Sequence, residues 1–209
     1  MIRAFLATEM GEDLRREVAR LQQQLKQQLP DDLVRRSRIQ WVQPSNIHLT
    51  LKFLGNTDER LVEPLREAIS LRAAAQHAIH LPLERLGAFP GFQQPRVLWI
   101  GPSEEWEQAD ASQRLTELHR AIEECCRSFG WAPEGRPLSP HLTLARIKDG
   151  ERHVGQVLVQ SVVIERPVAL GILPIDRIVL VKSELRPTGS VYTKLWEVRL
   201  NRTGEHAGP

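Results

Sequence analysis

The sequence is poor in cysteine, in net charge and in long hydrophobic runs. Its two cysteines are neighbours, Cys125 and Cys126. Adjacent cysteines in a predicted helix have poor geometry for a disulfide, which excludes a disulfide-stabilised scaffold. We therefore expect a reducing, cytoplasmic location. Two cysteines without further soft ligands nearby also argue against a structural zinc site.

The absence of long apolar stretches bears on the membrane. No apolar run approaches the ~18 residues that a membrane-spanning helix needs, so no membrane association is expected. The opening stretch, residues 1–7, is short and soon followed by charged residues, which is typical of a first strand and not of a signal peptide. No glycine-rich nucleotide-binding pattern occurs either, so a cofactor held in that way is not expected.

Lysine and arginine number 28 against 26 aspartates and glutamates, which leaves a net charge of +2. With this balance, any contact with nucleic acid must come from a local patch and not from bulk charge. Hydrophobic residues make up 41% and charged residues 26% of the 209, as in ordinary soluble globular proteins. We expect a single two-lobed domain over residues 1–200 and a polar tail over residues 201–209.

Strands and helices alternate along the chain, but short hairpin-like turns mix with longer crossovers. This mixture predicts an α+β fold with mostly antiparallel sheets. Residues 154–164 contain valines typical of a strand, although their spacing favours a helix. Helices are further expected over 11–29, 58–75 and 109–129. Strands are expected over 2–8, 39–42, 48–54, 78–83, 86–89, 97–100, 141–147, 175–183 and 192–200.

The tetrapeptide His-Leu-Thr-Leu occurs twice, at residues 48–51 and 141–144. Because side chains alternate between the faces of a strand, His48 and Thr50 share one face and the leucines share the other. His141 and Thr143 are arranged alike. If the two halves of the chain are related by a pseudo-twofold axis, the two His–Thr pairs face each other across a cleft.

Two facing histidines suit concerted acid–base catalysis. With an unperturbed pKa of about 6.5, one imidazole can be neutral while the other is charged near pH 7. A neutral base and a charged acid on opposite sides fit in-line displacement at phosphorus. The hydroxyls of Thr50 and Thr143 can donate hydrogen bonds to the phosphoryl oxygens. No metal is required, and neither motif holds an acidic ligand for one.

Basic neighbours favour an anionic substrate. Lys52 lies two residues beyond Thr50, and strict alternation places it on the same face as His48. Arg146 lies five residues beyond His141, so it reaches the site only if the strand ends or bulges there. Its alternative is a salt bridge on the outer face, and alternation alone does not decide between these two positions.

Longer segments around the motifs resemble the bacterial and archaeal RNA 2′,3′-cyclic phosphodiesterases, also called 2′-5′ RNA ligases, of the two-histidine phosphoesterase superfamily. The resemblance covers residues 1–200 in order. The segments that match, with x for positions left unmatched, are RIQWVxPxNxHLTLKFLG (38–55), GAFP (87–90), PRVLWIG (95–101), PHLTLAR (140–146) and SxLxPxGxxY (183–192).

This resemblance implies a two-lobed α+β fold of pseudo-symmetric, mostly antiparallel sheets with outer helices around a central cleft. It implies hydrolysis of an RNA terminal 2′,3′-cyclic phosphate to a 2′-phosphomonoester without a cofactor. By position, His48 would donate the proton to the leaving 3′ oxygen and His141 would activate water. Thr50, Thr143 and Arg146 would bind the phosphate. The partner expected is RNA with a cyclic end, tRNA fragments among the candidates, with no obligate protein partner.

An aromatic at the rim of the cleft could stack on the terminal base, since stacking tolerates any base. Phe92 lies in a loop and is the best candidate by sequence, whereas Trp41 and Phe89 are expected in the core. Two other functions are also compatible with these motifs. The same site could join RNA ends reversibly through a 2′-5′ linkage, or it could bind such ends without catalysis.

Overall fold

The computed structural model describes residues 1–161, 168–187 and 189–201. Its strands are β1 (Ile2–Glu9), β2 (Ile39–Trp41), β3 (His48–Thr57), β4 (Ile79–Pro82), β5 (Arg85–Phe89), β6 (Val97–Gly101), β7 (Leu142–Ile147), β8 (Ile172–Ile175), β9 (Arg177–Arg186) and β10 (Gly189–Arg199). Its α-helices are α1 (Glu12–Gln27), α2 (Asp31–Arg36), α3 (Val62–Ala73), α4 (Glu104–Glu107), α5 (Asp110–Ser128) and α6 (Glu151–Gln160), and the 3-10 helices are η1 (Pro44–Asn46) and η2 (Glu59–Leu61).

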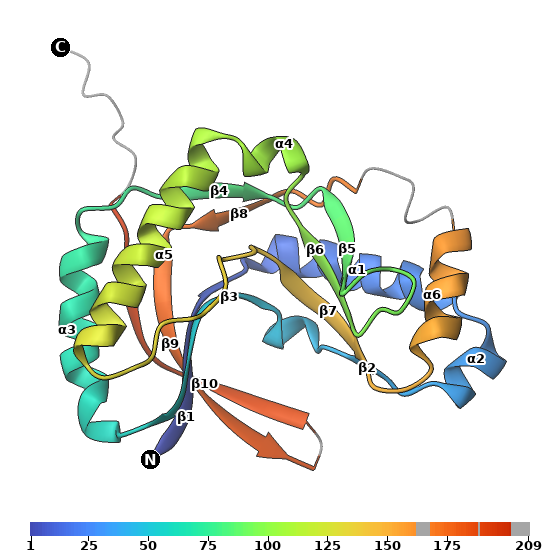
Figure 1. Cartoon of the computed structure of the whole chain (residues 1–209), viewed down its shortest axis with the longest axis horizontal. Helices are drawn as coiled ribbons and strands as arrows, with labels where there is room; N and C mark the ends of the chain where they lie inside the picture. The colour runs from blue at the N-terminus through green and yellow to red at the C-terminus, as the bar shows by residue number, and fades with distance from the viewer. Residues whose placement is uncertain (162–167, 188, 202–209) are drawn as a thin grey trace.

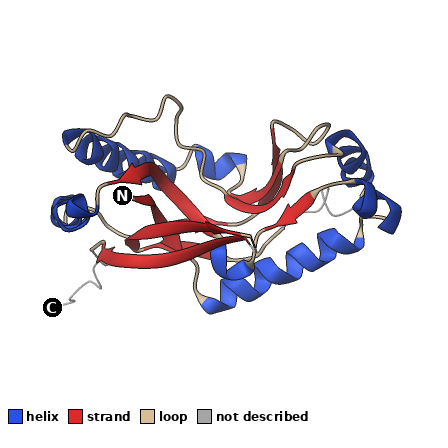
Figure 2. Ribbon diagram, turned by 90° about the horizontal axis from the view of Figure 1, so that it is seen from below, coloured by secondary structure: helices blue, strands red, loops and turns tan. Residues whose placement is uncertain are grey.

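Eight strands form one antiparallel sheet in the order β10-β9-β1-β3-β7-β6-β5, with β2 also paired to β7. The sheet is narrowest at its middle, because β3 and β7 pair only through Leu49 and Leu142. On either side of that point the strands diverge, and Figure 1 shows them as two groups. In Figure 2 the strands form the middle of the molecule, with helices on the outside. The predicted two-lobed α+β fold is confirmed.

The two lobes do not correspond to the two halves of the sequence. One lobe combines β1 and β3 with β9 and β10, and α3 and α5 cover it. The other combines β2 with β5, β6 and β7. Here α1 lies beneath the strands, since Gln22 Nε2 donates to the carbonyls of Val42 and Leu144. The first lobe therefore joins the two ends of the chain, whereas the strands of the second come from its middle, so a simple repeat of two halves is not what the structure shows.

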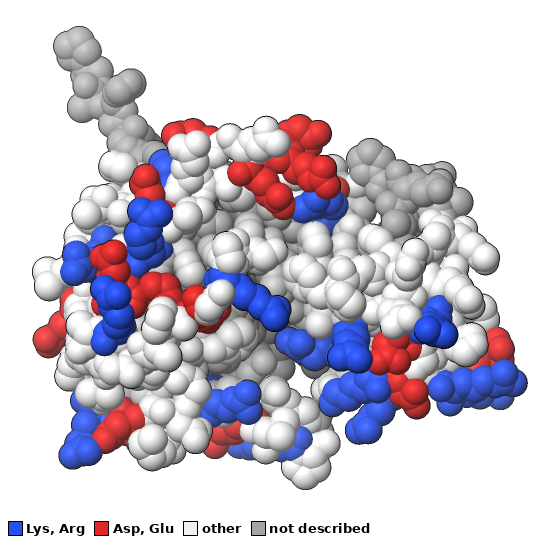
Figure 3. Space-filling model, viewed as in Figure 1, with Lys and Arg blue, Asp and Glu red and all other residues white. Residues whose placement is uncertain are grey.

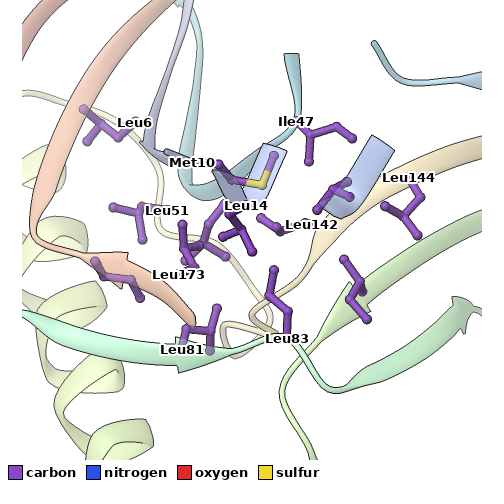
Figure 4. Close-up of a cluster of buried hydrophobic side chains, with 14 of the residues drawn as sticks. Leu6, Met10, Leu14, Ile47, Leu51, Leu81, Leu83, Leu142, Leu144 and Leu173 are labelled. Atoms are coloured by element: carbon purple, nitrogen blue, oxygen red, sulfur yellow. The ribbon is translucent and has the colours of Figure 1, made fainter. Parts of the chain in front are cut away.

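The leucines of both HLTL motifs anchor their strands in one core. Leu51, Leu142 and Leu144 are all at most 1% exposed. Figure 4 shows them in one cluster with Leu6 of β1 and Leu81 of β4. Burying a leucine side chain contributes about 1.5–3 kcal/mol, so these positions fix both strands firmly. The opposite faces of the two strands are thereby turned toward the cleft.

Each HLTL strand contains a β-bulge immediately after its threonine. In β3, Thr50 faces Ala7 and Lys52 faces Leu6, which leaves Leu51 as the extra residue. In β7, Thr143 faces Trp99 and Ala145 faces Leu98, which leaves Leu144 as the extra residue. A bulge shifts the alternation of side chains by one position. This shift decides where the residues that follow each motif point.

The remaining differences from the predicted elements are local. Two short helices, α2 and α4, and the short strand β8 were not expected. The valine-rich segment does form a helix, α6, which ends at Gln160. Residues 162–164 of that prediction, and the tail from residue 202 onward, lie outside the described residues. Among the helices described, none combines the length and the apolar character that crossing a membrane would take.

Candidate active site

His48 stands at the start of β3 in an aromatic setting. Its ring stacks on Phe5 of β1, with ring centroids 4.6 Å apart and an interplanar angle of 22°. The ring of Tyr192 meets it edge-on at 5.5 Å. Its Nδ1 lies 2.8 Å from the carbonyl oxygen of Asn46. The imidazole is therefore fixed in position by two rings and one hydrogen bond.

His141 immediately precedes β7 and is held in the same manner. Its Nδ1 lies 2.7 Å from the carbonyl oxygen of Ser139, again two residues earlier in the chain. The ring of Phe89 meets it edge-on at 5.0 Å, and Trp99 lies at 6.2 Å. The two histidines thus share one local arrangement, although they come from different lobes.

These hydrogen bonds define the tautomer of both rings. A carbonyl oxygen only accepts, so Nδ1 must carry the hydrogen and donate it. In the neutral form Nε2 is then the nitrogen with a free lone pair. Each histidine therefore has Nε2 free to take up or release a proton.

One cleft of about 490 Å³ brings the two motifs together. Both histidines, both threonines and Arg146 line it. Within residues 1–161, 168–187 and 189–201, neither threonine hydroxyl has a hydrogen-bond partner, and the Arg146 guanidinium has no carboxylate in ion-pair distance. Further lining residues are Arg3, Ala4, Phe5, Val42, Asn46, Ile47, Phe53, Gly55, Ser183, Leu185, Ser190 and Tyr192.

The bulge in β7 explains how Arg146 enters the cleft. Without the extra residue Leu144, strict alternation would turn Arg146 away from the face that holds His141. With it, Ala145 points into the core and Arg146 points out beside His141. The sequence made this position conditional on such a bulge, and the structure meets that condition.

The same bulge in β3 has the opposite consequence for Lys52. Its side chain is 1% exposed and lies on the core side, so the prediction that it faces the substrate is wrong. Its Nζ is 2.7 Å from Oε1 of Glu123 on α5 and donates to the carbonyl of Ala132 at 3.0 Å. Lys52 therefore ties α5 and the loop after it to the strand. Phe53 takes its place on the cleft side, 61% exposed.

Phe92 is also not where the sequence placed it. It is half-buried against the hydrophobic core and does not line the cleft, so it is not the stacking residue predicted. Phe89 is half-buried as well, and it packs on His141. Phe5 and Phe53 line the cleft but were not predicted from the sequence. For Phe5, the alternation along β1 is a usable signal once that strand is known to neighbour β3.

Burial lowers the pKa of both histidines below 6.5. In each case the hydrogen bond from Nδ1 to a carbonyl acts in the opposite direction, because it favours the charged ring, and Arg146 adds to the lowering. The two sites differ in their charged neighbours, and a charge on His141 further lowers the pKa of His48. His48 has a nearby carboxylate, Glu9, that raises its pKa, and among the residues that shift the pKa of His141 there is none.

Other reactive groups lie away from the cleft. Burial raises the pKa of the Cys126 thiol to about 12 and raises that of Cys125 as well, so neither is a ready nucleophile. In the part of the chain that the structure describes, no three His, Cys, Asp or Glu side chains converge as metal ligands would. Figure 3 shows Lys and Arg most densely at the lower right, over β2 and α2, with acidic residues interspersed.

Comparison with known proteins identifies the family of the chain. The family model described as LigT like Phosphoesterase matches residues 10–99 and 107–192. An RNA 2′,3′-cyclic phosphodiesterase of Methanocaldococcus jannaschii is 31% identical over 198 residues, which is 94% of this chain and 99% of that protein. One of Thermus thermophilus is 36% identical over 175 residues, covering 79% of this chain and 76% of that protein.

Solved structures give the same fold. A crystal structure of a Thermus thermophilus protein superposes with a TM-score of 0.65 at 28% identity, covering 97% of this chain and 100% of that one. Escherichia coli LigT complexed with 3′-AMP gives 0.66 at 23% identity, over 95% and 98% of the two chains. With a family model that spans most of its length and relatives above 30% identity, the chain belongs to the LigT-like phosphoesterases.

Proposed function

We propose that this enzyme hydrolyses the 2′,3′-cyclic phosphate at an RNA end to a 2′-phosphomonoester. The observation that carries the proposal is the pair of histidines in one cleft, each with Nδ1 bound to a carbonyl and Nε2 free. Relatives that match nearly the whole chain bear the name RNA 2′,3′-cyclic phosphodiesterase, which supports the same substrate class.

The proposed reaction is an in-line displacement at phosphorus. His141 Nε2 takes a proton from a water molecule as its oxygen forms a bond to phosphorus. The bond from phosphorus to the 3′ oxygen breaks, and the protonated Nε2 of His48 gives its proton to that oxygen. The phosphate stays on the 2′ oxygen. Each turnover thus moves one proton onto His141 and one off His48, and solvent restores both.

The phosphoryl oxygens carry negative charge throughout this step. Arg146 and the hydroxyls of Thr50 and Thr143 line the same cleft, so they are the proposed donors to these oxygens. A guanidinium held without a carboxylate partner among the described residues is suited to a phosphate, since it can donate two parallel hydrogen bonds. No metal is needed for charge neutralisation in this scheme.

Glu9 supports His48 as the acid. It stands directly opposite His48 in the pairing of β1 with β3, and it raises the pKa of that imidazole. A carboxylate beside the ring favours the protonated form that a general acid must have. Among the groups that shift the pKa of His141 there is no carboxylate, which suits a general base.

The lowered pKa values predict the pH dependence of kcat/KM. Activity on the acid side requires a neutral His141 and rises as that group loses its proton. Activity on the alkaline side requires a protonated His48 and falls as that group is deprotonated. Because burial lowers both pKa values, we expect a bell-shaped profile with its maximum below pH 6.5. A maximum at or above pH 7 would contradict the assigned environments.

Replacing Glu9 by glutamine tests the assignment of the acid. Without the carboxylate the pKa of His48 falls further, so the alkaline limb of kcat/KM should move to lower pH while the acid limb stays in place. Glu197→Gln is the matched control. Glu197 and Glu9 both form an ion pair with Lys194, but Glu197 is not among the groups that shift the pKa of either histidine. Movement of the acid limb instead would assign the acid role to His141.

Product analysis tests the proposed function itself. An oligoribonucleotide with a 2′,3′-cyclic phosphate end is incubated with the enzyme in excess chelator, and the product is identified by 31P NMR. We expect turnover to a 2′-phosphomonoester. Binding without turnover, a 3′-phosphomonoester, or loss of activity in the chelator would each overturn the proposal.

A further inference from the structure

A row of cationic side chains leads out of the cleft along β7 and β2. Arg146 is exposed in the cleft, and Lys148 follows it on the same face, because Ile147 between them is buried. Arg38 lies beside Lys148, since the backbone N–H of Lys148 donates to the carbonyl of Arg38 at 2.8 Å and continues the pairing of β2 with β7. Figure 3 shows Lys and Arg following one another from the middle of this face toward its lower right.

The last turn of α2 extends this row. Leu33 anchors the helix in the core, and Arg35 and Arg36 are exposed in the turn that leads to β2. A close contact fixes the chain there, since Gly150 packs so tightly on Ser37 that no side chain would fit at position 150. We define the basic strip as Arg35, Arg36, Arg38 and Lys148.

No carboxylate neutralises the basic strip in the part of the chain that the structure describes. None of its four side chains lies within ion-pair distance of Asp or Glu, whereas Arg85 and Arg177 on other strands each contact a carboxylate. Asp149, next to Lys148, accepts from the backbone N–H of Gly150 at 2.9 Å. The carboxylates of α2 stand in its first turn, at the far end from its arginines. Like charges held side by side repel, so a row of unpaired cations is typical of a surface that binds a polyanion.

The basic strip continues from the residue proposed to hold the phosphoryl group. Lys148 lies about 7 Å beyond Arg146, two residues along an extended chain. A polynucleotide carries one negative phosphate per nucleotide, so a chain whose end lies at Arg146 has its next phosphates within reach of the strip. The net charge of the protein is only +2, so the attraction of RNA depends on a local row of this kind.

We infer that the basic strip binds the phosphodiester backbone of the RNA chain that bears the cyclic end, beyond its terminal nucleotide. This inference rests on the proposed function, which places the cyclic phosphate at Arg146. It predicts that affinity rises with chain length and depends strongly on salt, because each phosphate contact releases counterions. It also predicts little dependence on base sequence, because contacts to phosphate carry no sequence information.

Binding of product RNA tests the basic strip independently of catalysis. The ligands are adenosine 2′-phosphate and an oligoadenylate of about ten nucleotides with a terminal 2′-phosphate, long enough to cover such a surface. Their Kd values are measured by calorimetry at several salt concentrations. The strip variant combines Arg35→Gln, Arg36→Gln, Arg38→Gln and Lys148→Gln. It should weaken the oligoadenylate by roughly 10- to 100-fold, as expected for four exposed ion pairs, and adenosine 2′-phosphate by less than about twofold.

The salt dependence gives a second readout of the same contacts. For the oligoadenylate, the slope of log Kd against log salt concentration should fall by about 3 in the strip variant, since each contact with a single strand contributes about 0.7. The matched control removes the same charge from exposed arginines of α3 and α5, outside the cleft: Arg66→Gln, Arg72→Gln, Arg120→Gln and Arg127→Gln. It should change either Kd by less than about twofold, because distant exposed charges are screened.

An equal loss for both ligands, an unchanged salt slope, or a loss as large in the control variant would overturn the inference. Turnover of the matching oligoadenylate with a 2′,3′-cyclic end is followed in parallel with wild type. Absence of turnover would overturn the proposed hydrolysis, while the Kd values would still decide whether the basic strip binds RNA.

Discussion

Alanine at His48 or at His141 is expected to lower kcat for a 2′,3′-cyclic phosphate by roughly 10²–10⁴-fold, the usual contribution of one general acid or base. Each ring has Nε2 as its free nitrogen in one shared cleft, so neither can substitute for the other. Effects of two residues that act in one step are not additive. The double variant should therefore lose little more than either single variant.

Asparagine variants separate chemistry from structure. In wild type, Nδ1–H of His48 donates to the carbonyl of Asn46, and that of His141 donates to the carbonyl of Ser139. The side-chain amide of an asparagine at either position can still donate to the same carbonyl. These variants should keep their fold, by circular dichroism, and lose the same catalytic factor as the alanine variants. Activity close to wild type in either asparagine variant would show that the histidine positions its neighbours and transfers no proton.

Lys52→Ala is expected to lower the free energy of unfolding by about 3–5 kcal/mol, the cost of leaving a buried partner charge uncompensated. Lys52 is 1% exposed, and its Nζ lies 2.7 Å from a carboxylate oxygen of Glu123, whose side chain is 14% exposed. The same ammonium group holds the carbonyl of Ala132. Urea denaturation monitored by tryptophan fluorescence measures the change. The slope of the unfolding free energy against urea reflects the surface exposed on unfolding, so a lower midpoint at the same slope reports lost stability.

The double variant Lys52→Met with Glu123→Leu is the matched control. Replacing both partners of a buried ion pair by apolar residues is often close to neutral, so much of the lost stability should return. A substrate-binding lysine would behave differently. In that case Lys52→Met alone would raise KM and leave the urea midpoint unchanged, and this result would contradict the structural role.

Strand alternation predicted the faces of the HLTL motifs but not the faces of the residues beyond them. His48, Thr50, His141 and Thr143 all line the cleft as alternation requires. Beyond each threonine the alternation of side chains is shifted by one residue, because a bulge leaves Leu51 or Leu144 unpaired. A bulge of this kind depends on pairing with the neighbouring strand, and the sequence of one strand does not contain that information.

The bulge at Leu51 therefore explains both the wrong prediction for Lys52 and the absence of a prediction for Phe53. The prediction for Arg146 was conditional on a bulge, and that condition is met. The prediction for Lys52 rested on strict alternation, which placed a buried lysine on the substrate side and gave no reason to consider the exposed Phe53 beside it. Loop position was a poor guide as well, since Phe92 lies in a loop and still packs on the core.

Sequence patterns also could not predict which strands and helices combine to form each lobe. Periodicity located the helix over α1 and the helix over α5 with errors of a few residues. It gave no sign that α1 packs beneath β7 while α5 packs beneath β3, because amphipathic helices fit any apolar sheet face. The resemblance to a known family supplied the two-lobed arrangement that periodicity could not.

A sulfur substitution at the leaving position tests the unequal roles of the two histidines most directly. In a 2′,3′-cyclic phosphorothiolate with sulfur at the 3′ position, the bond from phosphorus to sulfur breaks and the 3′ sulfur leaves as a thiolate. This leaving group needs no general acid, because a thiol has a pKa of only about 8.5. The measurement is kcat of wild type, His48→Asn and His141→Asn on this substrate and on its oxygen counterpart. We expect sulfur to restore most of the activity of His48→Asn and none of that of His141→Asn. Rescue of His141→Asn alone, or of neither variant, would contradict these roles.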